Sequence, residues 1–305
     1  MLRRWEPAVS KDALTSSSPP SPGARETSAE PKGSILRNLF CILVVVIWLM
    51  LMFPLACLVM LLTWSADNSM WVARRLFAPV VLWAGGAREV VSGREHADPS
   101  RPTIYVSNHQ STSDIPALLT ALPVNVRFVA KKQLRWVPIV GWYLQMAGHI
   151  IVDRSNTRAA IASLDEAARK IRGGTSIIVF PEGTRSPDGR ILPFKKGPFA
   201  LAIKAGVAIC PVTIEGSGKL MPKRSWRILP GEIRVKIGEP IDASQFKEQD
   251  RDQLMRLVRN VMIAQSLELG GKGGDPQDAI AARGFEGVGQ PRLEKQGEDE
   301  GLPTT

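Results

Sequence analysis

The chain has 305 residues, which is room for one sizeable domain and further segments. Its formal net charge of +10, from 39 basic and 29 acidic residues, suits an anionic partner: a nucleic acid, acidic lipid headgroups or a phosphorylated substrate. Cys41 and Cys57 lie in an apolar run and Cys210 in a predicted core strand. This distribution argues against a disulfide framework and favours a reducing compartment.

Both ends of the chain have a composition that argues against folding. Residues 1–34 include the serine- and proline-rich stretch Ser16–Gly23, and residues 270–305 hold nine glycines, scattered charges and no sustained apolar period. Such segments bury too little apolar surface to offset the entropy lost on ordering. We expect disordered tails at 1–34 and 270–305.

A long apolar run follows the first tail. Leu39–Trp64 contains no charged residue, and as a helix it is longer than the roughly 30 Å hydrocarbon core of a bilayer. A signal sequence would have an apolar region of about 7–15 residues nearer the N-terminus. We therefore expect a membrane-embedded helical segment at 35–66. Pro54 leaves two alternatives open, one kinked helix that spans the membrane or two half-length helices that re-enter it.

Charge around this segment bears on its topology. Basic residues flank it on both sides, which favours a cytoplasmic location for both flanks and suits a re-entrant hairpin as well as a single span. Residues 67–98 are expected to form an interfacial connector, with Met70–Trp83 as an amphipathic helix in the headgroup layer. Trp64, Trp71 and Trp83 fit an interfacial belt.

From residue 99 to 269 short apolar runs alternate with helical periods, which predicts one folded domain. The alternation indicates an α/β fold with a mostly parallel sheet flanked by helices. Strands are expected at Thr103–Ser107, Val124–Ala130, His149–Val152, Ser176–Phe180, Ala208–Ile214 and Glu232–Ile237, and helices at Thr157–Arg172, Phe199–Ala205 and Gln253–Leu269.

A histidine and an aspartate follow the first strand of this domain. Five positions apart on one helix, His109 and Asp114 would point about 140° away from each other. A turn over Gln110–Thr112 can instead fold His109 back onto Asp114, with Ser113 as the cap of a new helix. A carboxylate on one imidazole nitrogen leaves the other free to take a proton from a hydroxyl group. Alternatively, each residue simply caps a turn or a helix.

Further charged residues follow other strands. Phe180–Ser186 sits at a strand end, where open α/β sheets bind ligands. In it, Gly183 permits an unusual backbone angle, Arg185 can grip a phosphate, and Glu182 can orient Arg185 or meet a substrate hydroxyl. Lys131 and Arg154 each end another strand, and Lys195–Gly197 can add to this basic edge. Each of them alone is more often a solvated charge than a ligand.

Several other functions fail on residue spacing. Gly216–Lys219 lacks the remainder of a Walker phosphate loop, and no G-x-S-x-G nucleophile elbow is present. With three histidines and no paired cysteine spacing, a zinc site is not expected. No motif for nucleic-acid recognition accompanies the positive charge, so no nucleic-acid partner is expected.

The order of these motifs is similar to that of a known family. Asn108–Asp114, Gly148–Arg154, Phe180–Ser186 and Ile209–Val212 resemble the four ordered blocks of the glycerolipid acyltransferases, and most of all the bacterial 1-acyl-sn-glycerol-3-phosphate (lysophosphatidic acid) acyltransferases. The resemblance covers roughly residues 75–240. The first and third blocks together are specific, whereas the second and fourth are weak alone. Cys210 before Pro211 is a small variation.

The resemblance implies a set of roles. His109 would be the general base and Asp114 its orienting partner, while Lys131, Arg154 and Arg185 would hold the phosphate of the acceptor. Glu182, Gly183 and Thr184 would shape the site around the glycerol of the acceptor, and Pro211 a substrate wall. The acyl donor would be acyl-CoA or acyl-carrier protein, without a metal or other cofactor. The enzyme would sit on the inner (cytoplasmic) membrane, beside anionic lipids, with its catalytic domain on the cytoplasmic face.

Two alternatives to lysophosphatidic acid acylation stay open at this point. The acceptor can be another lysolipid, such as a lyso-ornithine lipid or another lysophospholipid, because the sequence does not choose among acceptors. A non-enzymatic lipid-binding protein of the same fold is the other alternative. Binding alone does not need a general base, so an intact His109 and Asp114 argue against it.

Overall fold

The computed structural model describes residues 35–275 apart from 138–139, 153–156 and 224, and these residues all belong to one compact unit, residues 33–305. The predicted tail at 1–34 lies outside the described residues, as does the tail predicted for 270–305 from residue 276 onward. Residues 270–275 are described, and they are considered below.

The described residues form an eight-stranded mixed sheet in the order β1-β7-β6-β2-β5-β3-β4, with β8 paired to β6. The five strands from β6 to β4 are mutually parallel, whereas β7 runs antiparallel to β6. This confirms the predicted α/β class with a mostly parallel sheet. The strands are β1 (Ala87–Ser92), β2 (Thr103–Ser107), β3 (Val126–Lys131), β4 (Ile150–Val152), β5 (Ser176–Val179), β6 (Ala208–Glu215), β7 (Gly231–Ile237) and β8 (Ile241–Asp242).

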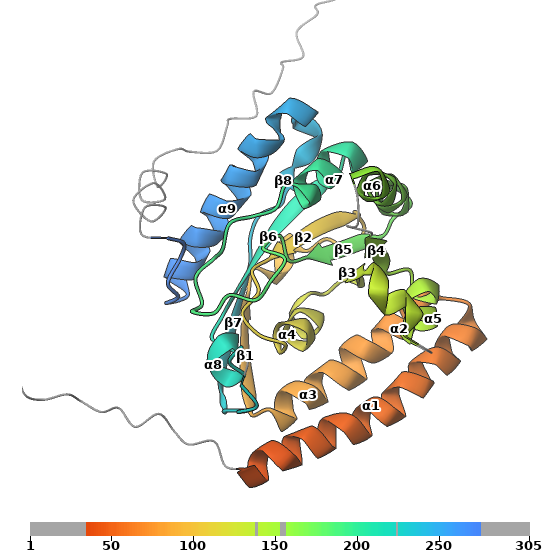
Figure 1. The fold of residues 1–305 in the computed structure, drawn as a ribbon, viewed down its shortest axis with the longest axis vertical. Coiled ribbons are helices and arrows are strands. Elements are labelled where there is room, and N and C mark those ends of the chain that lie inside the picture. The colour runs from red at the N-terminus through yellow and green to blue at the C-terminus, as the bar shows by residue number, and fades with distance from the viewer. Residues whose placement is uncertain (1–34, 138–139, 153–156, 224, 276–305) are drawn as a thin grey trace, which may run out of the picture. The chain divides into compact units, whose positions relative to one another are not determined.

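Helices cover both faces of this sheet (Figure 1). One face packs against α6, α7 and α9, and the other against α4 and the helical segment from α2 to α3. The helices are α1 (Ile35–Thr63), α2 (Ala66–Val72), α3 (Ala78–Ala84), α4 (Asp114–Ala121), α5 (Val140–Met146), α6 (Thr157–Arg172), α7 (Gly197–Ala205), α8 (Ser217–Leu220) and α9 (Arg251–Glu268). Short 3₁₀ segments lie at Arg94–His96, Lys132–Trp136, Ala243–Gln245 and Glu248–Asp250.

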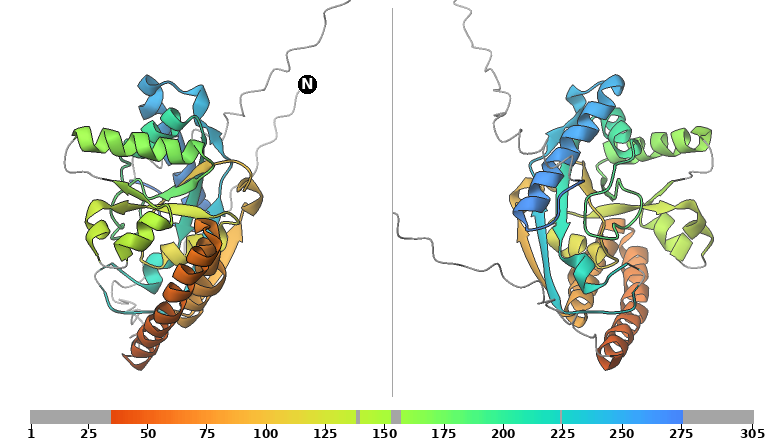
Figure 2. Two further views of the ribbon diagram at one scale, coloured as in Figure 1. Left: turned by 90° about the vertical axis from the view of Figure 1, so that its right-hand side faces the viewer. Right: turned by 60° about the vertical axis from the view of Figure 1, so that its left-hand side comes forward.

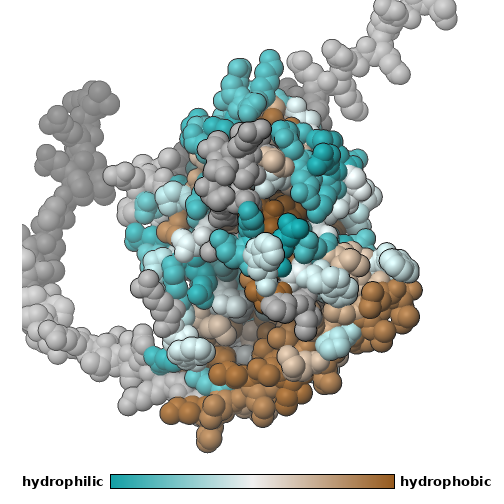
Figure 3. Space-filling model, turned by 45° about the vertical axis from the view of Figure 1, so that its right-hand side comes forward, coloured by the Kyte–Doolittle hydropathy of each residue, from teal (hydrophilic) through white to brown (hydrophobic). Residues whose placement is uncertain are grey.

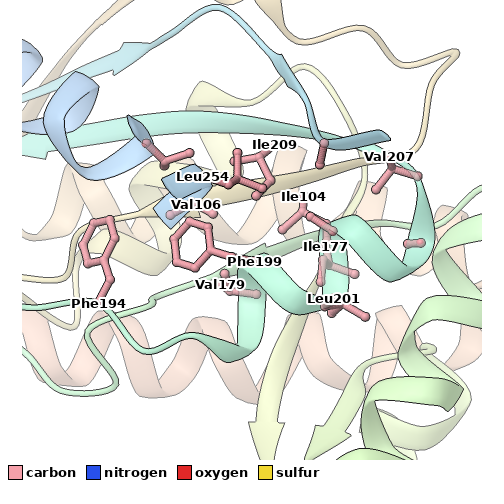
Figure 4. Packing of buried hydrophobic residues seen from close by; sticks show 14 of the residues in the cluster. Ile104, Val106, Ile177, Val179, Phe194, Phe199, Leu201, Val207, Ile209 and Leu254 are labelled. Atoms are coloured by element: carbon pink, nitrogen blue, oxygen red, sulfur yellow. The ribbon is translucent and has the colours of Figure 1, made fainter. Parts of the chain in front are cut away.

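Strand β2 lies at the centre of the sheet and is buried on both faces. Its side chains alternate, so Ile104 and Val106 face the α7 and α9 side while Tyr105 faces the α4 side. Figure 4 shows Ile104 and Val106 packed among Phe199, Ile209 and their neighbours. This packing fixes the position at which β2 ends, and the site begins there.

The N-terminal segment is a helical hairpin. Helix α1 is continuous through Pro54, so the alternative of two half-length helices is not what the structure has. Helices α2 and α3, joined by a π-helical stretch at Ala73–Phe77, run back along α1. Cys41 Sγ lies 2.8 Å from Ala84 O, and Trp48 Nε1 donates to Leu76 O at 2.9 Å. Both views of Figure 2 show α1 as a long helix beside this second arm.

Residues 67–98 do not form a separate interfacial connector as predicted. They contain the second arm of the hairpin and also β1, which pairs in parallel with β7. Burial along β1 alternates between half-buried and exposed, as in an edge strand, and its charged residues Arg88 and Glu89 hid it in the sequence. The folded domain therefore starts earlier than residue 99.

One residue of the hairpin fixes the helix that follows β2. Arg74 donates through Nη2 to Leu122 O at 2.6 Å, and through Nε to Leu119 O at 3.3 Å. Its Nη1 donates to Asn125 Oδ1 at 3.1 Å. These acceptors include carbonyl groups at the C-terminal end of α4, where cations are favoured. Arg74 thus joins the hairpin to α4 and does not simply point to lipid headgroups.

The chain stays packed beyond residue 269, where the predicted domain ended. Gly273 O accepts a hydrogen bond from Ile191 N at 2.8 Å, and Gly271 N donates to Ser266 O at 2.7 Å. Glycine composition suggested disorder here. Glycine instead lets this segment approach the end of β6 closely, because it has no side chain.

Candidate active site

The predicted site residues follow strands whose carboxyl ends meet at one edge of the sheet. Strands β2, β5, β3 and β4 are parallel, so the residues after each strand face the same side. Lys131 is the last residue of β3 and is paired in register with Val152, and only its backbone is described. Arg154 lies outside the described residues.

The residue after β2 extends the sheet by means of its side chain. Asn108 is almost fully buried, and its amide both donates to Ile214 O at 2.9 Å and accepts from Ile214 N at 2.8 Å. These two bonds occupy both backbone groups of a residue on β6. On the other side, His109 O accepts from Ser186 N at 2.7 Å. The backbone of His109 is thereby fixed between β6 and the loop after β5.

His109 and Asp114 lie in direct contact, which is the first of the two interpretations that the sequence left open. Nδ1 of His109 is 2.7 Å from Oδ2 of Asp114, and the same oxygen accepts from Gln110 N at 2.7 Å and Ser111 N at 2.9 Å. Because this oxygen also accepts from two backbone N–H groups and a carboxylate only accepts, the proton of the pair belongs on Nδ1. Asp114 starts α4, as expected, but Ser113 bonds to Ser111 and does not cap the helix through its side chain.

The imidazole ring of His109 is held flat by an aromatic neighbour. Its ring stacks on Phe180 with a centroid distance of 4.1 Å and an interplanar angle of 18°. The side chain keeps 18% of its surface exposed. Of its two ring nitrogens, only Nδ1 has a hydrogen-bond partner among the described residues. Nε2 is therefore the ring nitrogen that can meet a substrate group. Phe180 was part of a predicted motif, but its contact with the ring was not foreseen.

Glu182 supports the backbone of the histidine. It is 4% exposed, and its Oε1 accepts from His109 N at 3.2 Å. Burial raises the pKa of this carboxyl group to about 8, although bonds from the backbone of His109 and Leu192 oppose the shift. Its Oε2 is buried with no hydrogen-bond partner among the described residues. In this arrangement Glu182 binds the backbone of His109. The sequence had instead suggested that Glu182 contacts Arg185 or a substrate hydroxyl.

The left-handed backbone favours glycine at the next position. Gly183 has a φ of +70°, and a Cβ built there would lie 3.0 Å from Cε and 2.8 Å from Nζ of Lys195. The side chain of Lys195 therefore lies over this turn. The structure thus brings Lys195, from the segment that the sequence offered only as an addition, onto the Glu182–Arg185 motif.

Arg185 and Thr184 lie beside the His109 loop. Arg185 Nη1 donates to Thr112 Oγ1 at 3.0 Å, which joins the two motifs. Lys223 Nζ donates to Arg185 O at 2.5 Å, and it is 3.3 Å from Thr184 Oγ1. Sequence reasoning missed Lys223. The only signal was a basic run after α8, whose approach to Arg185 depends on the tertiary fold.

The approach of the Lys223 loop is fixed at a second point. Ser111 Oγ donates to Met221 O at 3.0 Å, so the loop after α8 is bonded to both motifs. Three loops, after β2, after β5 and after α8, therefore meet at one place. They bring together a histidine held by a carboxylate and at least two cationic side chains, Arg185 and Lys223. Among the described residues no group of three His, Cys, Asp or Glu side chains is placed to hold a metal ion.

Comparisons with known proteins agree with this architecture. The family model described as Acyltransferase matches residues 88–215. A 1-acyl-sn-glycerol-3-phosphate acyltransferase of Limnanthes douglasii is 37% identical over 185 residues, which is 60% of this chain and 65% of the relative. The 1-acyl-sn-glycerol-3-phosphate acyltransferase alpha of Ovis aries is 33% identical over 220 residues, 72% of this chain and 76% of the relative.

A solved structure shows the same fold. The crystal structure of PlsC, the 1-acyl-sn-glycerophosphate (LPA) acyltransferase from Thermotoga maritima, superposes with a TM-score of 0.67 at 32% identity, over 78% of this chain and 96% of that chain. The fold and the site thus define an α/β acyltransferase. More narrowly, the chain belongs to the 1-acyl-sn-glycerol-3-phosphate acyltransferase family, which confirms the resemblance seen in the sequence. The match spans 65% of the Limnanthes relatives and about half (51% and 49%) of two chloroplast relatives.

The raised pKa of Glu182 predicts a pH-dependent stability. Its folded pKa of about 8 exceeds its ordinary value, so the protonated form stabilises the fold below the ordinary pKa, and this stability is lost as pH rises through 8. Glu182→Gln keeps the acceptor for His109 N–H but cannot ionise. Relative to wild type, its free energy of unfolding should be similar at pH 4.5 and higher by a few kcal/mol at pH 9, at about 1.4 kcal/mol per pKa unit. Urea unfolding at both pH values checks this, and an equal difference at both would contradict the assignment.

Proposed function

We propose that the protein is a membrane-bound 1-acylglycerol-3-phosphate O-acyltransferase. It transfers a fatty acyl chain from acyl-CoA or acyl-carrier protein to the free hydroxyl of lysophosphatidic acid and forms phosphatidic acid. The observation that carries this proposal is the buried Asp114 carboxylate on Nδ1 of His109, which leaves Nε2 for the substrate, on a loop that Arg185 binds through Thr112. This arrangement is a general base that has its orienting group and needs no enzyme nucleophile, because the substrate brings its own hydroxyl.

The proposed reaction follows from the protonation of the ring. Nε2 of His109 takes the proton of the acceptor hydroxyl while the oxygen of that hydroxyl attacks the thioester carbonyl carbon. The C–S bond of the resulting tetrahedral intermediate then breaks, and the imidazolium returns the proton to the leaving thiolate. Asp114 stabilises the imidazolium between these steps through the 2.7 Å contact with Nδ1. Atoms and charge balance without a metal or other cofactor, and we propose that none takes part.

Cations beside the base would hold the headgroup of the acceptor. Arg185 presents a guanidinium fork suited to a phosphate group, and it lies one hydrogen bond from the His109 loop. Lys223 adds a second positive charge at the backbone of Arg185. We include Lys131, because its strand ends at the same edge, and also Arg154, which follows β4 in the sequence. Glu182, Gly183 and Thr184 would shape the turn that supports Arg185.

The N-terminal hairpin would place this site at a bilayer. Helix α1 has 29 residues and is long and apolar enough, by length and composition, to cross a membrane. Figure 3 shows an apolar band along one margin of the molecule, opposite a mostly hydrophilic surface. Residues of α1 that are at least half exposed include Leu39, Leu43, Met50, Leu51 and Leu58, and Trp64, Trp71 and Trp83 are exposed beside them.

Membrane attachment suits the chemistry because the substrate and product are lipids. The exposed tryptophans fit the interface between headgroups and hydrocarbon. We propose the inner (cytoplasmic) membrane, with the site on the cytoplasmic face and anionic lipids around the basic flanks of α1. A panel of lysolipid acceptors assayed with one acyl donor would separate lysophosphatidic acid from other lysolipids, such as a lyso-ornithine lipid.

The role of His109 is tested by its removal. His109→Ala should lower kcat for transfer of a radiolabelled acyl chain to lysophosphatidic acid by at least about 10²-fold, because it removes the group that accepts the hydroxyl proton in the proposed mechanism. His96→Ala is the matched control, since this histidine contacts Ile237 O away from the site and should leave turnover near wild type. Turnover retained in folded His109→Ala protein would end the proposal.

Arg185 should act on binding of the acceptor. Arg185→Ala removes a charge-assisted bond of about 1.5–3 kcal/mol, so the KM for lysophosphatidic acid should rise roughly 10- to 100-fold while the KM for the acyl donor stays unchanged. Arg190→Ala is the control, because Arg190 lies in the same segment and pairs with Asp188. An acceptor KM that did not change in steady-state kinetics would remove Arg185 from the phosphate site.

A further inference from the structure

A second buried carboxylate lies behind the His109 loop. Glu215 is the last residue of β6, is 5% exposed and belongs to none of the motifs found in the sequence. It directly follows Ile214, whose backbone N–H and C=O groups are both bonded to the side-chain amide of Asn108. A carboxylate buried at this point needs partners, because an uncompensated buried charge or polar group is strongly unfavourable.

One partner of Glu215 comes from the His109 loop itself. Oε2 of Glu215 accepts from Gln110 Nε2 at 3.0 Å, and the same amide nitrogen donates to Gly189 O at 3.2 Å. Both amide hydrogens of Gln110 are thereby used, and its side chain is 4% exposed. Glu215 therefore fixes Gln110 in one orientation within a water-excluded site.

The orientation of Gln110 matters because its backbone contacts Asp114. The Gln110 N–H donates to Asp114 Oδ2 at 2.7 Å, the same length as the bond from His109 Nδ1 to this oxygen. A residue with its side chain bound to Glu215 and its backbone bound to Asp114 joins the two carboxylates. Loss of the first bond would remove one restraint on the turn that sets the position of Asp114 relative to the imidazole, leaving the bond from Gln110 to Gly189 O.

The other side of Glu215 is closed by α9 and the residues after it. Oε1 accepts from Ser266 Oγ at 2.5 Å, and this hydroxyl in turn accepts from Gly273 N at 3.1 Å. A Cβ built on Gly271 would lie 2.3 Å from Cδ of Glu215, so only glycine fits this approach. Burial raises the pKa of Glu215, while the bonds from Ser266 and Gln110 oppose the shift.

We propose that Glu215 is a positioning residue of the catalytic pair, acting through the side chain of Gln110 on the turn that holds Asp114 against His109. Only the predicted effect on kcat rests on the proposed function; the effect on the turn that holds Asp114 does not. It predicts a loss in kcat without a loss in substrate binding, because Glu215 lies behind the loop and contacts neither the ring nitrogen Nε2 nor Arg185.

The test compares three variants with wild-type full-length protein. Glu215→Ala should lower kcat at least about tenfold with both KM values unchanged, whereas Glu215→Gln should stay near wild type, since its amide oxygen still accepts from Gln110. Thr213→Val is the matched control. Thr213 lies two residues before Glu215 on β6. The substitution removes its buried 2.8 Å hydrogen bond to Gln265 of α9 and should lower thermal stability without lowering kcat.

Two further measurements keep the outcome decisive. Hydrogen exchange of the peptide over residues 108–114 should speed up in Glu215→Ala and not in Thr213→Val, whatever acceptor the enzyme uses, so this readout is independent of the proposed function. If Glu215→Ala does not fold, Gln110→Met removes the same contact from the other side and should give the same loss of kcat and faster exchange. Wild-type kcat and exchange in a folded variant lacking the contact would overturn the proposal, as would an equal loss of kcat in Thr213→Val.

Discussion

The structure depends on one oxygen atom, Oδ2 of Asp114, which sits within 2.9 Å of three nitrogen atoms of the preceding turn. These three N–H groups stabilise the buried carboxylate through this one oxygen, and one of them is the ring N–H of His109, whereas Oδ1 is buried with no hydrogen-bond partner among the described residues. The bond fixes the tautomer and the orientation of the ring together, and it leaves Nε2 as the basic nitrogen. The chemistry proposed for the protein is the consequence of this single arrangement.

The rest of the fold serves to keep that turn in place. Strand β2 is locked between β5 and β6, so His109 leaves the sheet at a defined point. Glu182 accepts from the backbone N–H of His109, and the side chain of the preceding Asn108 is bonded to Ile214 of β6. Arg74 holds the far end of α4, whose first residue is Asp114. Because Arg74 belongs to the hairpin that carries the apolar surface, the same contacts that fix the catalytic helix also place it next to the proposed membrane face.

Much of this could be predicted from the sequence. Strand β2 matched its expected bounds because it is apolar on both faces, and α6 because its period ends at Gly173. The contact of His109 with Asp114 was one of two interpretations of their spacing, which excluded pairing on a single helix but did not exclude that each residue only caps a turn or a helix. Strand β1 was missed because an edge strand needs few apolar residues. Lys223 and Glu215 were missed because their importance comes only from which distant segment the fold places beside them: the Arg185 motif for one, and Gln110 and Ser266 for the other.

The most direct test of the account is kcat for acyl transfer to lysophosphatidic acid in Asp114→Asn, measured with both substrates saturating. An amide has the size of the carboxylate. However, an NH₂ group in the position of Oδ2 would face the N–H donors, or it would stabilise the wrong tautomer of the imidazole ring. We predict a fall in kcat of roughly 10³–10⁴-fold in protein whose thermal unfolding shows a retained fold. A kcat within a few-fold of wild type in such protein would contradict the claim that this carboxylate orients the base.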